Sequence, residues 1–198
     1  MAISYPLALP TITGFRSVDT AYPTVVGMAV SIFTGEQQVY RWPGQWIQWS
    51  VILPPMTEPQ AAVWVGFFLA LNGPEGTFYL GPAVRTVTGG TAAGAWAVNT
   101  GAVANSTTLP ITGGTGSFAV GDWLQVGATT ASKLHRVTQV NVGSVDVFPR
   151  LRSAYAGATG ITYTNPKGIF RLAGIPSESY DTAIISHGMN FGAIESLP

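Results

Sequence analysis

The 198-residue chain contains no cysteine and only two histidines, His135 and His187. The missing cysteine excludes disulfide bonds, thiolate zinc sites and a cysteine nucleophile together. It also means that folding does not depend on an oxidising compartment.

Charge is equally scarce. Nine acidic and nine basic residues make up 9% of the chain, against about 25% in an ordinary soluble domain. A net charge of zero gives no attraction for a phosphate backbone, which argues against nucleic-acid binding. Hydrophobic residues nevertheless reach 46%, with six Trp, seven Tyr and nine Phe. Because charge keeps monomers apart, this composition predicts a subunit that hides its surface in a larger assembly.

Long hydrophobic runs are missing too. The longest apolar stretch, Ala61 to Leu71, is well short of the roughly 18 to 20 residues that span a bilayer. The start, Met1 to Pro10, lacks the basic region of a signal peptide, and Pro6 and Pro10 interrupt any apolar core of one. We therefore expect synthesis and assembly in a cytoplasm, without membrane insertion.

Composition divides the chain into three segments. Residues 1–85 are rich in aromatic residues, residues 86–164 shift to Gly, Ala, Thr, Ser and Val, and residues 165–198 resemble the first segment again. This order predicts an outer domain built from 1–85 together with 165–198, and a second domain, 86–164, inserted between its two parts.

The outer domain is predicted to contain one helix. Thr57 can cap it, Gln60 follows three residues later as in a capping box, and Pro59 falls in the first turn. Asn72 and the following glycine end it. Because the apolar positions run nearly all round, we expect this helix to be covered on more than one side.

Strands are predicted around the helix. In the first segment they cover residues 24–33, 45–53 and 77–80, and in the last 168–173 and 183–194, with a polar turn at 176–181. In the strand 45–53 neither face is clearly polar, which is typical of a sandwiched or interface strand.

The inserted segment shows no helical periodicity. Short predicted strands at 107–111, 123–126, 134–140 and 144–148 are separated by glycine-containing turns. This spacing favours a small antiparallel barrel or sandwich. The fold class is thus mainly β: a β-sandwich-like outer domain with one α-helix and an inserted small antiparallel β-barrel.

Catalytic patterns are weak. A Ser186–His187 pair with Asp181 lacks the Gly-x-Ser-x-Gly elbow of a hydrolase, and neighbouring strand residues point to opposite faces. His135 has no second histidine at metal-ligand spacing. Asp122 and Asp146 could form a glycosidase pair, but an aspartate after glycine is more typical of a turn. We therefore predict no enzyme, no cofactor and no metal.

Several phrases together resemble the distal tail proteins of bacteriophages with long, non-contractile tails. They are, in chain order, residues 5–10 (YPLALP), 14–17 (GFRS), 33–40 (FTGEQQVY), 42–46 (WPGQW), 53–56 (LPPM), 76–81 (GTFYLG), 120–127 (VGDWLQVG), 134–137 (LHRV), 148–152 (FPRLR) and 165–172 (NPKGIFRL). The likeness extends over nearly the whole chain and rests on phrases, not on a catalytic signature.

The resemblance implies a structural virion protein. In that family a β-sandwich-like domain with one helix forms a hexameric ring, which joins the tail tube to the tail-tip or baseplate complex. Some members carry an inserted barrel that resembles an oligosaccharide-binding fold. The implied location is the phage tail, and the implied partners are further copies of the chain, the tube protein and the tip proteins.

Candidate residues for contacts between subunits can be chosen by residue type. Trp and Arg dominate interface hot spots, which points to Arg41, Trp42, Trp46 and Trp49 as subunit contacts, with each Trp equally compatible with an ordinary core position. Arg150 and Arg152 lie on one face of an extended segment, where a subunit salt bridge and an internal ion pair are both open.

Two alternative functions remain at this point. One is a neighbouring tail role, either a tube-terminating or a tip-scaffold protein. The other is binding of a host surface saccharide by the inserted barrel. For that role the large aromatic candidates are Trp96, Trp123 and Tyr155.

Overall fold

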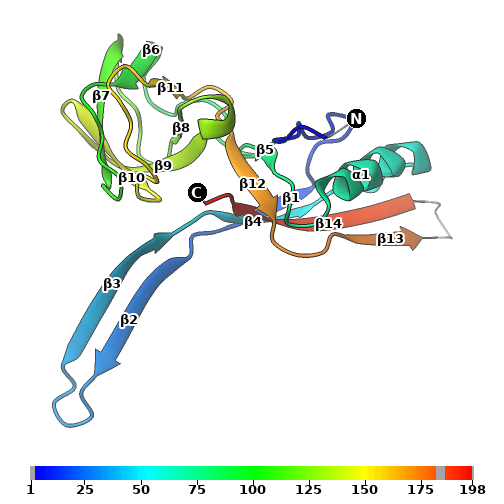
Figure 1. Cartoon of the computed structure of the whole chain (residues 1–198), viewed down its shortest axis with the longest axis horizontal. Coiled ribbons are helices and arrows are strands. Elements are labelled where there is room, and N and C mark those ends of the chain that lie inside the picture. The colour runs from blue at the N-terminus through cyan, green and yellow to red at the C-terminus, as the bar shows by residue number, and fades with distance from the viewer. Residues whose placement is uncertain (1–2, 182–185, 198) are drawn as a thin grey trace.

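The computed structural model describes residues 3–181 and 186–197, which form a main sheet, one helix, a closed barrel and a projecting two-stranded arm (Figure 1). The fold is mainly β with a single α-helix and a small antiparallel barrel in the described residues, which confirms the predicted fold class.

The main sheet is antiparallel and has the strand order β1-β4-β14-β12-β5, with β13 also pairing to β14. Its strands are β1 (Ser17–Ala21), β4 (Gln48–Ile52), β5 (Phe78–Leu80), β12 (Gly168–Leu172), β13 (Ser177–Asp181) and β14 (Ser186–Glu195). The predicted polar turn at 176–181 is wrong, because β13 gains its structure by pairing along β14, a contact that local sequence does not encode. The first residues of the predicted strand 183–194, 183–185, lie outside the described residues.

One face of this sheet carries the core. The side chains of Trp49 and Val51 on β4, and of Ile47 just before it, are buried, whereas Ser50 and Ile52 on the other face of the strand are exposed. The strand therefore alternates as period-2 geometry requires. Within the chain only one of its faces is covered in the described part, and α1 and the barrel together cover it.

Helix α1 (Glu58–Leu71) forms where its capping signals predict. The Gln60 side-chain oxygen accepts the Thr57 backbone N–H at 3.1 Å, and Asn72 ends the helix in the left-handed conformation at φ 50°. Trp64 is fully buried and packs against Phe191 of the sheet at 6.0 Å between ring centroids. Leu69, however, is exposed. Besides the sheet, the N-terminal segment contacts α1, since the Tyr5 hydroxyl donates to the Ala70 carbonyl at 2.6 Å and the Trp64 indole donates to Thr13 at 3.0 Å. The helix is therefore covered from two directions, and the side that carries Leu69 stays open.

The barrel closes in the order β10-β7-β6-β11-β8-β9. Its strands are β6 (Ala93–Val98), β7 (Thr108–Thr115), β8 (Trp123–Val126), β9 (Lys133–Asn141), β10 (Ser144–Phe148) and β11 (Gly160–Thr162), with a short 3₁₀ turn, η1 (Thr129–Ala131). Its interior is a separate cluster of buried aliphatic side chains that includes Leu109, Leu124 and Val145. All six strands lie between residues 93 and 162, and each strand of the sheet and the arm lies outside that range.

A buried polar cluster joins the barrel to the sheet. Arg152, just after the last strand of the β9–β10 hairpin, pairs with Glu195 of β14 at 2.8 Å, and Glu195 also accepts the Ile47 backbone N–H at 3.3 Å. Nearby, Lys133 donates to the Ser196 carbonyl at 2.6 Å. Trp49 and Trp123 meet edge to face at 5.9 Å. The barrel is thus fixed to the sheet by both polar and aromatic contacts.

Candidate assembly surfaces

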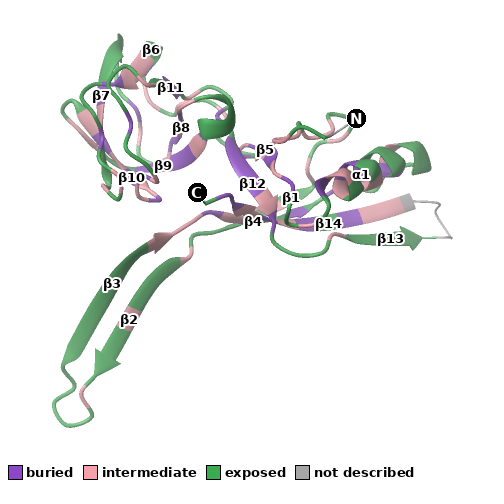
Figure 2. Ribbon diagram, in the orientation of Figure 1, coloured by how far each residue is buried: buried purple, intermediate pink, exposed green. Residues whose placement is uncertain are grey.

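The arm is a hairpin of β2 (Thr24–Val30) and β3 (Gln37–Gln45) that leaves the main sheet and extends away from it (Figure 1). Nearly all of it is exposed (Figure 2). In the described structure each of its strands pairs only with the other. A two-stranded hairpin is marginally stable alone in water, and its unpaired strand edges invite further pairing.

Apolar side chains are exposed along the whole arm. They are Val25, Val26, Met28, Val30, Ile32, Phe33, Val39, Tyr40 and Trp42. The effect is strongest at the tip, where Ile32 and Phe33 are 90% and 92% exposed. Soluble monomers rarely leave a contiguous apolar surface of this kind open, so the arm has the character of a contact surface.

Glycine allows one local feature of the arm. Trp42 on β3 lies across Gly27 on β2, so that a Cβ at Gly27 would stand only 3.1 Å from the indole ring. The missing side chain leaves room for the ring over Gly27, and Tyr40 lies beside it at 6.5 Å between ring centroids. A broad aromatic face results on this side of the arm.

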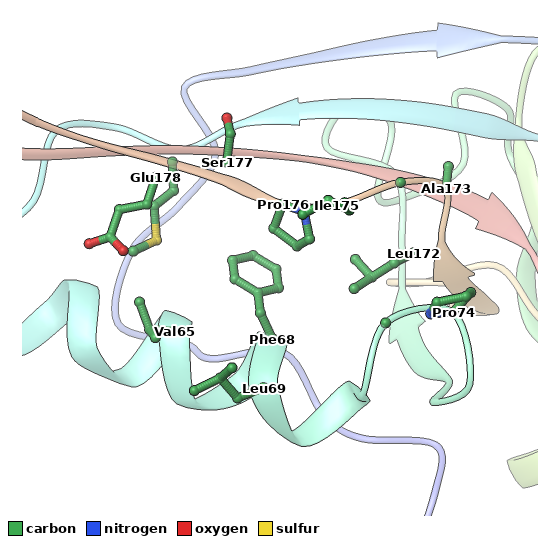
Figure 3. Close-up of a pocket in the computed structure, with 13 residues that line it drawn as sticks. Val65, Phe68, Leu69, Pro74, Leu172, Ala173, Ile175, Pro176, Ser177 and Glu178 are labelled. Atoms are coloured by element: carbon green, nitrogen blue, oxygen red, sulfur yellow. The ribbon is translucent and has the colours of Figure 1, made fainter.

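A second apolar surface is a groove between α1 and the segment that links β12 to β13. Its volume is about 580 Å³. From α1 it is lined by Val65, Phe68 and Leu69, and Phe68 points from the helix toward Pro176 (Figure 3). Leu172 and Ile175 complete the apolar wall. This groove uses the side of α1 that the main sheet leaves open.

Charge is confined to the rim of the groove. Glu178 lines its edge, and its carboxylate lies 2.9 Å from Nδ1 of His187 on the adjacent strand. The interior is apolar, so it suits hydrophobic side chains better than a charged ligand.

The predicted contact residues divide between surface and core. Arg41 and Trp42 lie exposed on the arm, and Trp46 is half-buried at its base. Trp49 is a correction: it is 2% exposed and stacks on Phe170 at 4.8 Å, because it falls on the core face of β4. Its ring therefore belongs to the core of this chain.

Arg152 is also a correction, since its side chain is only 9% exposed and forms the internal pair with Glu195. Arg150 turns inward as well. Its backbone N–H donates to the Gln45 side chain at 3.0 Å and its guanidinium to the Asn105 carbonyl at 3.1 Å. Both arginines therefore join parts of one chain.

The saccharide candidates do not form an exposed platform. Trp123 and Tyr155 are buried, and Trp96 is half-buried against Phe118 at 5.0 Å. Trp123 serves the junction with Trp49, so its ring is occupied by packing. The prediction that these three residues form an exposed aromatic platform is therefore wrong.

The two aspartates considered as a glycosidase pair, Asp122 and Asp146, instead accept hydrogen bonds that stabilise the loops and strands around them. Asp122 accepts hydrogen bonds from Thr88 at 2.5 Å and from the backbone N–H groups of Gly89 and Ala119, both at 2.8 Å. Asp146 accepts from Thr108 at 2.6 Å and from Asn141 at 3.2 Å. The side chain of Ser186 lies outside the described residues. Among residues 3–181 and 186–197, no three His, Cys, Asp or Glu side chains gather as a metal site would require.

His135 is fully buried in the barrel–sheet junction, with Nδ1 2.9 Å from the Pro149 carbonyl. Burial lowers its pKa below the ordinary 6.5, and the charges of Arg152 and Lys133 lower it further, against the opposing effects of Glu195 and the Pro149 hydrogen bond. The folded protein therefore holds His135 neutral.

This burial predicts acid sensitivity. Below pH 6.5 the unfolded chain binds a proton at His135 before the folded chain does, so the free energy of unfolding falls as the pH drops toward the lowered folded pKa. The contribution is at most about 1.4 kcal/mol per pH unit. Urea unfolding at several pH values should show a smaller slope below pH 6.5 for His135→Gln than for the wild type. Equal slopes would contradict the prediction.

No protein-family model matches the chain, and no curated protein sequence matches it. Within the described residues, no helix is long and apolar enough to cross a membrane.

Proposed function

We propose that the chain is a structural virion protein, a distal tail protein whose copies form a hexameric ring between the tail tube and the tail-tip or baseplate complex of a long-tailed phage. The observation that carries the proposal is the arm, residues 24–45, an exposed apolar hairpin without a partner in the described chain. The sequence resemblance supplies the identity of the assembly, and the low charge is consistent with a subunit buried among others.

The arm and the groove fit a contact between two copies. They lie at opposite ends of the molecule, with the arm running from one end of the main sheet and the groove beside α1 and β13 at the other (Figure 1). An arm therefore has the position to meet the groove of another copy instead of its own. Such a head-to-tail contact joins two different surfaces, and it produces a closed ring when the rotation between copies closes.

Size and chemistry support this pairing. A stable interface uses about 20 to 30 residues from each partner, and the arm covers residues 24–45. Its tip presents Ile32 and Phe33, while the groove offers about 580 Å³ between apolar walls. Burial of these side chains is favourable on both sides, and large apolar anchors in pockets are typical of interface hot spots.

Engineered cysteines test the pairing directly, because the chain has none of its own. A Phe33→Cys variant mixed with a Leu69→Cys variant should form a disulfide-linked dimer under mild oxidation. The double variant should give a covalent ladder that ends at about six copies on a non-reducing gel. Native mass measurement of the uncrosslinked protein should show the same closed species.

Val142→Cys provides the control, since Val142 is fully exposed on the β9–β10 turn of the barrel and lies outside the groove. Phe33→Cys should not crosslink to it. If Phe33→Cys links to Val142→Cys, or to itself, as readily as to Leu69→Cys, the head-to-tail pairing is wrong. A strictly monomeric protein at high concentration would count against self-assembly as well.

A further inference from the structure

A cleft of about 370 Å³ lies where the barrel meets the main sheet. Three parts of the chain build it. The sheet and the residue that follows β1 contribute Val18, Thr20, Trp49 and Tyr22. The link from β5 to the barrel contributes residues 82–85, and the barrel contributes Trp123 and Arg136. Domain junctions are a common place for ligand sites, and this volume lies within the range of about 300 to 1,000 Å³ that is typical of small-molecule sites.

Two guanidinium groups converge on this cleft. Arg85 Nη1 and Arg136 Nη2 lie 2.6 Å and 3.7 Å from the point that a Cβ on Gly121 would occupy. Gly121 has a φ of 88° and no side chain, which leaves room for both. Arg85 itself has a φ of 58°, a backbone conformation that long side chains rarely adopt. The link therefore bends at Arg85, whose guanidinium donates to the Val120 carbonyl at 2.7 Å and lies beside Gly121, as that of Arg136 does.

The two charges are only partly compensated. Arg85 lies 3.6 Å from the buried Asp122 carboxylate, which also accepts the hydrogen bonds of the preceding loop. Arg136 has no carboxylate within 4.0 Å in the described structure. It is held by the Gly121 carbonyl at 3.3 Å and by the Tyr22 hydroxyl. One positive charge therefore remains in the cleft without an acidic partner among the described residues.

Two aromatic rings hold the Arg136 guanidinium in place. Arg136 lies over the rings of Tyr22 and Trp123, at 5.6 Å and 5.3 Å from their centroids. Tyr22 is in turn held edge-on by Phe148 at 5.5 Å. A guanidinium held in this way loses little side-chain freedom when it binds an oxyanion, and its planar N–H groups match a carboxylate or a phosphate.

We propose that this cleft binds an acidic sugar, with the carboxylate or phosphate of the sugar between Arg85 and Arg136 and the ring against Tyr22. The inference is independent of the ring assembly, because every group it uses belongs to one chain. It differs from the saccharide site predicted from sequence, since recognition rests on two arginines at the junction and not on an exposed Trp platform of the barrel.

Titration of the intact protein tests the cleft, with tryptophan fluorescence as the signal because Trp49 and Trp123 line it. Glucuronate and glucose 1-phosphate represent the two oxyanions, glucose the neutral ring and inorganic phosphate the bare ion. We expect a saturable response to one or both acidic sugars. Glucose and inorganic phosphate should give none at the same concentration. The stronger of the two acidic sugars identifies the oxyanion.

Substitutions in and outside the cleft test whether the acidic sugar binds there. Arg85→Gln should weaken binding by about tenfold, as loss of one charged hydrogen-bond donor implies. The charge-matched control Lys167→Gln, at an exposed cation outside the cleft, should not. Val84 is exposed at the cleft, so Val84→Asp should weaken binding by repulsion while Val84→Asn should not. This pair leaves both arginines in place, so it remains informative if Arg85→Gln unfolds the junction.

Three results would overturn the proposal. They are equal binding of glucose and glucuronate, an adventitious response to inorganic phosphate only, and the absence of a saturable response to either acidic sugar up to about 10 mM. Equal effects of Val84→Asp and Val84→Asn would also place the ligand elsewhere. None of these outcomes bears on whether the arm assembles copies into a ring.

Discussion

Replacement of Glu195 by glutamine is expected to lower the free energy of unfolding by about 3–5 kcal/mol. The Glu195 side chain is 1% exposed and its partner Arg152 is 9% exposed, so the variant leaves a buried guanidinium without its counter-charge. The same carboxylate holds the Ile47 backbone N–H at 3.3 Å. Urea unfolding followed by circular dichroism measures the loss.

Two comparisons separate the ion pair from a general effect of the substitution. Glu178→Gln makes the same chemical change in a carboxylate that is 46% exposed and paired with His187, and it should cost at most about 1 kcal/mol. Replacement of both Glu195 and Arg152 by methionine removes the two charges together and should restore much of the stability. A small effect of Glu195→Gln alone would mean that the pair does not hold the junction.

The helix and four of the six barrel strands could be predicted because their signals are local, whereas β6 and β11 were not predicted. Thr57, Gln60 and Asn72 set the two ends of α1 within a few residues of sequence. The barrel strands are short and separated by glycine turns, so that a strand such as Trp123–Val126 is bounded on both sides by its own sequence. Capping and turn chemistry act over three or four residues, which is the range that a single sequence exposes.

Strand β2 lies within the predicted strand 24–33, but β3 and the projection of the hairpin from the sheet were not predicted, and there is a physical reason for this. Pro43 lies within β3 and argues against a strand. Pro43 is compatible with the strand because the β2–β3 register shifts opposite it, between Thr24 and Val26. At such a bulge one residue is left unpaired, so the backbone N–H that proline lacks is not needed. Whether such a hairpin packs on the sheet or projects from it depends on contacts elsewhere in the fold, and these are not encoded locally.

Contacts between residues far apart in the sequence could not be predicted either. Arg152 and Glu195 are far apart in sequence, and nothing in the segment 149–152 distinguishes an internal pair from a subunit contact. The convergence of Arg85 and Arg136 over Gly121 depends on how the β5–barrel link bends. The contrast between Trp42 and Trp49 has the same origin, because register decides which of two similar residues meets the core.

That contrast gives the second large expected effect. Trp49→Ala should lower the free energy of unfolding by about 3–5 kcal/mol, because it removes a buried ring stacked on Phe170 and leaves a cavity at the barrel–sheet junction. Trp42→Ala makes the identical change on the arm, where the ring is 54% exposed, and should alter global stability by no more than about 0.5 kcal/mol. Urea unfolding of the two variants side by side measures both values.

Assembly should respond in the opposite order. If the aromatic face of the arm contacts a second copy, Trp42→Ala removes a hot-spot side chain and should raise the dissociation constant of the oligomer by about 30-fold or more. Trp49→Ala should leave that constant nearly unchanged at temperatures where the protein stays folded, since its ring is only 2% exposed and lies at the barrel–sheet junction, away from the arm. Sedimentation across a concentration series resolves the two. If the oligomer persists in the Trp42→Ala variant, the aromatic face of the arm is not part of the contact between copies. The contact would then have to be made by the tip residues Ile32 and Phe33.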